Sequence, residues 1–185
     1  MRIVFNLHNV GLGNNGGSRT LLRCAETLQA LGAEVYIYAD KSKYTWHKTL
    51  VPIVAKAPRC DVMIATGYRS VPSTIKARAS RKYYYIRGFE LWQADEKMLF
   101  DSYRSLNCIV NSEWLQRYLA GNGVSSQIVY PGLDFEWFYN KNKEIQHRIG
   151  GLFHVKHATK RAGDVMAIAS AVGQKPFLVN KHVKN

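Results

Sequence analysis

The chain has 185 residues, 46% of them hydrophobic, so it is long enough to bury a core and is not a disordered protein. Its 26 lysines and arginines outnumber 13 aspartates and glutamates, and the formal net charge of +13 favours anionic partners: phosphates, nucleic acid or an acidic membrane face. No apolar run approaches the ~18 residues that span a bilayer, and no signal peptide is visible. Three isolated cysteines predict reduced core thiols in a cytoplasmic protein, namely Cys24, Cys60 and Cys108.

The first forty residues predict a strand–helix–strand unit. The apolar run at 2–7 indicates a buried strand, and a second strand is expected at 34–40. Between them, Ser18 is the expected N-cap of a helix that Gly32 ends. Because a helical crossover of this length joins parallel strands, we expect a parallel sheet.

The same alternation continues to residue 132. Further strands are expected at 61–66, 82–88, 108–112 and 126–132, and helices at 71–80, 93–105 and 113–123. Pro72 is compatible with the first turn of its helix. The predicted fold class is therefore α/β, with a Rossmann-like parallel sheet flanked by helices.

A second unit is expected after a charged linker at 140–148. The pattern restarts with a strand at 149–155, a helix at 160–173 and a strand at 175–181. Three such elements cannot cover both faces of a sheet. We therefore expect residues 1–145 to form one domain and residues 146–185 to be the opening of a truncated second domain.

The glycine-rich loop at 11–18 lies between the first strand and the first helix. Gly11, Gly13 and Gly16 match G-x-G-x-x-G, and Asp40 stands where a ribose-binding carboxylate belongs, so an NAD(P)-dependent oxidoreductase is one hypothesis. A P-loop is disfavoured because Gly17 occupies the position of its lysine. A glycine loop before a helix also suits a phosphate or sugar hydroxyls, and the remaining alternative is a flexible turn.

Four motifs in chain order resemble the GT-B glycosyltransferases of family 4, the retaining, nucleotide-sugar-dependent group. They are Gly16-Gly17, then Asn111-Ser112 with Trp114, then Gly132-Leu133-Asp134 with Phe138, then Gly150-Gly151 with Lys160. The segment YYYIRGFELW at 83–92 is similar to one in rhamnosyltransferase-type members. The chain would then be the N-terminal, acceptor-side domain followed by the start of the donor-binding domain.

The resemblance implies transfer of a sugar from a nucleotide-diphosphate sugar to a carbohydrate or lipid-linked acceptor. It implies no tightly bound cofactor and no metal, and the basic charge suits peripheral contact with an anionic membrane at the inner face. The glutamate pair of the family's donor site is absent from this sequence, and His154 or Lys156 stands near the place of its donor-phosphate arginine. We expect the 185-residue chain alone to be inactive, as a trimmed fragment or the product of a shortened gene.

The predicted binding residues follow from these motifs. The amides of Gly16 and Gly17 are expected to meet the donor, and cations are expected to stabilise its phosphates. Glu90, between Phe89 and Trp92, is the candidate catalytic or acceptor-binding carboxylate, with a surface pair to Arg87 as the alternative. The full set of predicted binding residues is Gly16, Gly17, Arg87, Glu90, Asn111, Lys160 and Arg161.

Two further alternatives stay open at this point. The segment Asn111-Ser112 can serve simply as a helix N-cap, and His8 is expected to be packed rather than functional. The charge and the segment RKYYYIR at 81–87 also suit a nucleic-acid-binding module without catalysis. Because its tyrosines alternate along a strand, at least one should be buried, so nucleic acid is not the expected partner.

Overall fold

A computed structural model of the chain describes residues 1–132, 150–153, 162–173 and 177–180. The chain divides into two units, Met1–Gly132 and Leu133–Asn185. The predicted boundary at 145/146 and the linker at 140–148 lie outside the described residues. The first unit contains β1 (Arg2–Asn6), α1 (Gly16–Ala30), β2 (Glu34–Tyr38), β3 (Ile53–Val54), β4 (Cys60–Ala65), the 3-10 turn η1 (Tyr68–Ser70), α2 (Val71–Lys76), β5 (Ala79–Ile86), α3 (Glu96–Arg104), β6 (Asn107–Val110), α4 (Glu113–Gly121) and β7 (Ser126–Ile128).

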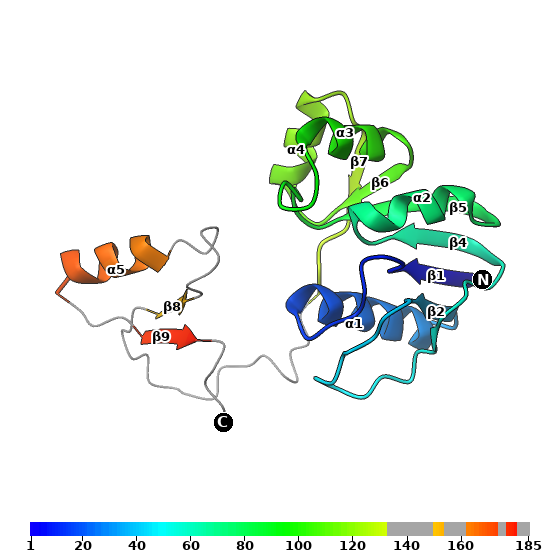
Figure 1. The fold of residues 1–185 in the computed structure, drawn as a ribbon, viewed down its shortest axis with the longest axis horizontal. Coiled ribbons are helices and arrows are strands. Elements are labelled where there is room, and N and C mark those ends of the chain that lie inside the picture. The colour runs from blue at the N-terminus through cyan, green and yellow to red at the C-terminus, as the bar shows by residue number, and fades with distance from the viewer. Residues whose placement is uncertain (133–149, 154–161, 174–176, 181–185) are drawn as a thin grey trace. The chain divides into compact units, whose positions relative to one another are not determined.

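The first unit is built on a seven-stranded sheet in the order β3-β2-β1-β4-β5-β6-β7 (Figure 1). Every pairing in it is parallel. The predicted α/β fold with a Rossmann-like parallel sheet is thereby confirmed. The strand order reverses between β1 and β4, and open sheets of this kind bind ligands at such a switch point, outside the carboxyl ends of the strands.

Side-chain alternation assigns each strand residue to one of the two covered faces. Phe5 of β1 and Tyr85 of β5 pack in one cluster with Leu22 of α1. Tyr84 of β5 packs in a second cluster with Leu99 of α3. Burial on both faces is characteristic of parallel sheets. The side chains of β5 that face α1 are thus the odd-numbered ones. Arg87, the residue that follows the strand, is therefore expected on the same face.

The start of α1 differs from the prediction. The N-cap is Asn15, whose side chain accepts a hydrogen bond from the Ser18 amide at 2.8 Å. The predicted N-cap, Ser18, is instead buried in the first turn, where its Oγ accepts from the Gly13 amide at 3.2 Å. Asparagine and serine cap equally well, so composition alone could not choose between them. Gly32 follows the helix with φ +86°, which confirms it as the terminating residue.

Other elements also differ from the predicted bounds. The strand predicted at 126–132 ends at Ile128, and the helix predicted at 93–105 begins at Glu96. The helix predicted at 71–80 ends at Lys76, because Ala77 is already extended with ψ 150° and Ala79 begins β5. β3 was not predicted; it consists of two residues at the edge beside β2. Cys60 and Cys108 are buried, Cys24 is partly buried, and all three are free.

The second unit contains three described elements, as expected. β8 (Gly150–Phe153) pairs in parallel with β9 (Phe177–Asn180), and α5 (Ala162–Ala171) lies between them in sequence. Among the helices of the described residues, none combines the length and the apolar character needed to cross a membrane.

The end of β1 carries a buried polar side chain that the sequence analysis did not single out. Asn6 is fully buried, and its Nδ2 donates to Ser73 Oγ and Thr74 Oγ1, each at 2.8 Å, and to the Ser70 carbonyl at 3.2 Å. Its Oδ1 accepts from the His8 amide at 2.9 Å. Asn6 therefore fixes α2 and the start of the β1–α1 loop at the switch point.

Candidate functional site

The candidate site lies at the carboxyl ends of β1, β4, β5 and β6, where the β1–α1 loop meets the first turn of α1. That loop is held along its length by the segment after β2. The Leu12 amide donates to the Lys41 carbonyl at 2.9 Å, and the Lys43 amide donates to the Leu12 carbonyl at 2.7 Å. Asn14 and Thr45 exchange two hydrogen bonds of 2.8 and 2.7 Å. The glycine-rich stretch is thus a fixed loop and not a free turn.

The first two amides of α1 are open at this loop. Within the part of the chain that the structure describes, neither the Gly16 nor the Gly17 amide donates to a protein acceptor, whereas the Ser18 amide is used by Asn15. No atom lies within 4 Å of where a Gly16 side chain would begin. These amides stand at the positive end of the helix dipole, so they can receive an anion.

Arg87 lies beneath this helix start. As the next odd-numbered residue after β5, it continues the α1 face of the sheet. Its Nη1 donates to the Gly17 carbonyl at 2.6 Å, and its Nη2 donates to the Thr66 carbonyl at 3.2 Å. The guanidinium carbon is 5.9 Å from the centre of the Tyr85 ring. Burial lowers the pKa of Arg87. Coulombic interactions with Tyr85 and Glu90 act in the opposite direction and raise it. Its Nε is buried and has no hydrogen-bond partner among the described residues.

Gly17 is needed for this arrangement. A side chain at residue 17 would begin 2.9 Å from Nη1 of Arg87 and 3.1 Å from Oδ1 of Asn15. One side of Gly17 is therefore filled by the guanidinium, while neighbouring Gly16 stays exposed. The predicted glycine pair thus divides into a residue that admits Arg87 and a residue that faces solvent.

Asn111 and Ser112 have separate tasks. Ser112 is the N-cap of α4 and accepts from the Leu115 amide at 3.4 Å. Asn111 does not cap the helix; its Nδ2 donates to the Arg87 carbonyl at 3.2 Å. The N-cap hypothesis is therefore confirmed for Ser112, whereas ligand binding by Asn111 stays a prediction.

Glu90 lies beside the same site but bonds to other groups. Its Oε2 accepts from the Tyr68 amide at 2.9 Å and from the Tyr84 hydroxyl at 3.2 Å. Burial raises the pKa of the Glu90 carboxyl, and the hydrogen bonds from Tyr68 and Tyr84 work against that rise. The alternative of a surface ion pair with Arg87 is not found among the described residues, because both guanidinium bonds go to carbonyls.

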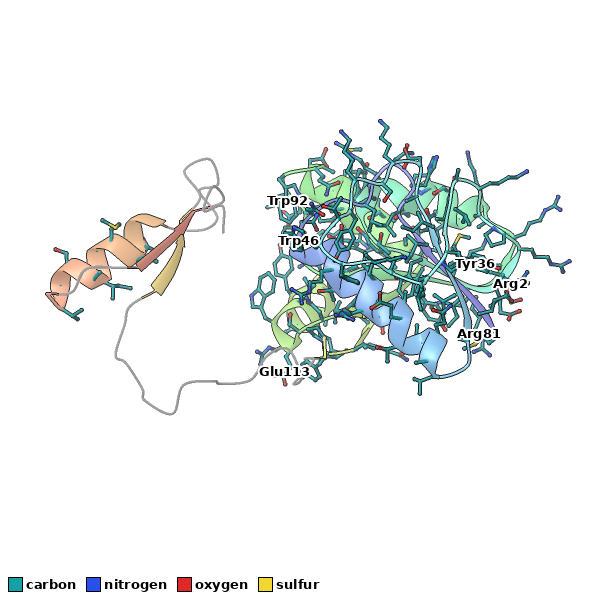
Figure 2. All side chains as sticks on the ribbon, turned by 90° about the horizontal axis from the view of Figure 1, so that it is seen from below. Arg2, Tyr36, Trp46, Arg81, Trp92 and Glu113 are labelled. Carbon is teal, nitrogen blue, oxygen red and sulfur yellow. The ribbon has the colours of Figure 1, made fainter. Side chains whose placement is uncertain are left out.

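The aromatic residues that flank Glu90 differ in exposure. Phe89 packs against Phe100 and Tyr118, with ring centres 5.8 and 5.0 Å away. Trp92 is 70% exposed. Figure 2 shows Trp92 and Trp46 at the end of the first unit opposite Arg2 and Arg81. Trp92 alone of the two flanking rings is thus available to a ligand.

The remaining predicted residues divide into packed and undescribed ones. His8 stacks on Tyr38, with ring centres 5.2 Å apart, in line with the expectation of packing. The expectation that at least one tyrosine of β5 is buried is confirmed, and both Tyr84 and Tyr85 are buried because each face of the sheet is covered. Within the described ranges, no group of three or more His, Cys, Asp or Glu side chains is placed to hold a metal ion. The positions outside the described residues are Asp134, Phe138, His154, Lys156, Lys160 and Arg161.

No protein-family model matches the chain, and a search of curated proteins gives no match. The likeness to GT-B glycosyltransferases therefore depends on the motifs of this chain alone.

Substitution of the two glycines separates their roles. In Gly17→Ala the new methyl group lies 2.9 Å from Nη1 of Arg87, so the guanidinium must shift against the Gly17 carbonyl. Gly16→Ala has no such neighbour, and both substitutions gain the same helix propensity. We expect the free energy of unfolding of Gly17→Ala to be lower than that of Gly16→Ala by about 1–2 kcal/mol in urea titrations. Equal stabilities would mean that Arg87 does not depend on the missing side chain.

The partly buried carboxyl of Glu90 predicts a pH dependence of stability. Because its folded-state pKa is raised, the folded protein keeps a proton that the unfolded chain releases, and stability falls as pH rises through this window. Glu90→Gln removes the charge and keeps an acceptor oxygen. We expect its free energy of unfolding, relative to wild type, to increase from about pH 4 to about pH 7 in urea titrations. The exposed Glu113→Gln is the control, and a difference that is constant with pH for Glu90→Gln would contradict the prediction.

Proposed function

We propose that this chain is the acceptor-side part of a retaining glycosyltransferase that uses a nucleotide-diphosphate sugar and a carbohydrate or lipid-linked acceptor. One observation carries the proposal. Gly17, Arg87 and Asn111 come from three separate segments that the resemblance singled out, and they are joined at the switch point by hydrogen bonds of 2.6 and 3.2 Å. A parallel sheet brings these three segments to the same edge, and the hydrogen bonds among them support a shared site.

The charge distribution at this point suits the reaction. When the sugar–phosphate bond breaks, negative charge grows on the leaving diphosphate and must be stabilised by fixed dipoles or cations. The Gly16 and Gly17 amides at the start of α1 and the nearby guanidinium of Arg87 supply both. Lys160 and Arg161 stay predictions for the same role.

The acceptor side of the proposal depends on Glu90 and Trp92. Oε2 of Glu90 is occupied by two donors, whereas Oε1 has no partner among the described residues and can accept a hydroxyl hydrogen bond. Trp92 offers an exposed ring on which a sugar can place its C–H face. No tightly bound cofactor or metal is part of the proposal.

Binding of nucleotide sugars to the 185-residue chain tests the proposal without requiring turnover. Calorimetric titrations with UDP-glucose, GDP-mannose and dTDP-rhamnose are expected to give binding for at least one of them. Arg87→Gln and Arg87→Lys should weaken that binding about tenfold, because a charge-assisted contact is lost or loses its planar geometry. Arg81→Gln, at an exposed arginine six residues earlier in the chain, should leave it unchanged.

The same titrations can refute the proposal. Urea unfolding curves first establish that the Arg87 variants are folded. Binding of NAD(P) in place of all three nucleotide sugars would favour an oxidoreductase, and DNA binding with a steep salt dependence would favour a nucleic-acid module. Nucleotide-sugar binding that is the same in wild type and in the folded Arg87 variants would contradict the proposed site.

A further inference from the structure

A hollow that Arg87 does not line opens at the carboxyl edge of the sheet beside β2. Its volume is about 600 Å³, within the range of small-molecule sites. Three segments line it: the loop after β1, the end of β2 and the 3-10 turn after β4. The lining residues are Asn9, Val10, Gly11, Asp40, Lys41 and Arg69, and we call this space the β2 hollow.

The backbone along the β2 hollow is held in an uncommon shape. Asn9 has φ +62° and Gly11 has φ +76°, both in the left-handed region. The Asn9 amide donates to Oδ1 of Asp40 at 3.1 Å, and the Gly11 amide donates to the Leu7 carbonyl at 2.9 Å. Asparagine and glycine both adopt this region readily, so the two residues suit the tight turn that forms this wall of the β2 hollow.

The lining combines two cations with one carboxylate. Neither Lys41 nor Arg69 forms an ion pair with another described residue, and both are exposed. Asp40 uses Oδ1 for the Asn9 amide, and its Oδ2 has no hydrogen-bond partner among the described residues. Of the lining side chains, Val10 alone is apolar, so the β2 hollow has no flat apolar wall for a nucleobase.

We propose that the β2 hollow binds a small hydroxylated anion, that is, a sugar that carries a phosphate or a carboxylate. Lys41 and Arg69 pair with the anionic group, and Oδ2 of Asp40 accepts a hydroxyl hydrogen bond. A neutral sugar would leave both cations without a partner, whereas inorganic phosphate would pair with the cations but bring no sugar hydroxyl to Asp40. This inference is independent of the proposed glycosyl transfer.

Heteronuclear NMR titrations of the full chain test the inference with five probes: glucose 6-phosphate, glucuronate, glucose, inorganic phosphate and NAD. We expect glucose 6-phosphate or glucuronate to bind more tightly than glucose or phosphate, with the largest amide shifts at residues 9–11 and 40–41. The two anionic sugars also distinguish a phosphate ligand from a carboxylate ligand.

Variants of the lining residues assign the contacts. Lys41→Ala and Arg69→Ala should each weaken binding of the better anionic sugar about three- to tenfold. Asp40→Asn keeps the acceptor for the Asn9 amide, and it should abolish the preference for the anionic sugar over phosphate. Lys43→Ala removes an exposed lysine that does not line the β2 hollow, and binding should not change.

Three results would overturn the inference. They are an absence of binding of both anionic sugars at roughly 10 mM, amide shifts confined to other regions, and tighter binding of NAD than of either anionic sugar. None of them bears on nucleotide-sugar binding at Arg87. Likewise, failure of that binding would leave the β2 hollow unaffected.

Discussion

A guanidinium that leaves water must find acceptors, because a buried ion without partners costs several kcal/mol. Arg87 meets this requirement with the carbonyls of Gly17 and Thr66, at 2.6 and 3.2 Å, and with the nearby Tyr85 ring. One carbonyl belongs to the first turn of α1, and the other follows β4. A single side chain therefore joins the glycine loop to the switch point of the sheet. The hydrogen bond from Arg87 to the Gly17 carbonyl forms without a shift of the guanidinium only because residue 17 has no side chain.

The alternation of side chains along the parallel strands decides which groups meet at that point. Arg87 follows β5 on the face covered by α1, so it reaches Gly17. Asn6 ends β1 on the opposite face, and its amide bonds to α2. A register shift of one residue in either strand would exchange the faces and bury each polar group among apolar side chains. The site is thus a consequence of register, with one polar residue placed above the sheet and one below.

The sequence predicts the elements of this fold well and their contacts poorly. Strong periodicity and glycine punctuation locate β1, α1 and Gly32 from local chemistry alone. β3 escapes prediction because two paired residues carry no periodic signal. The bond between Arg87 and Gly17 spans 70 residues, and that between Asn6 and Thr74 spans 68, so only the folded sheet brings them together. A polar residue at the end of an otherwise buried strand is the signal that could have singled out Asn6.

The Nε–H group of Arg87 reports most directly on the central claim, that a guanidinium held by two backbone carbonyls fixes the helix start beside an anion-binding site. Its signal in heteronuclear NMR spectra can be assigned by its loss in Arg87→Lys. The account predicts that this hydrogen exchanges with water more slowly than that of the exposed Arg81, and that its signal shifts when UDP is added. Exchange as fast as for Arg81, together with no response to UDP, would contradict the account.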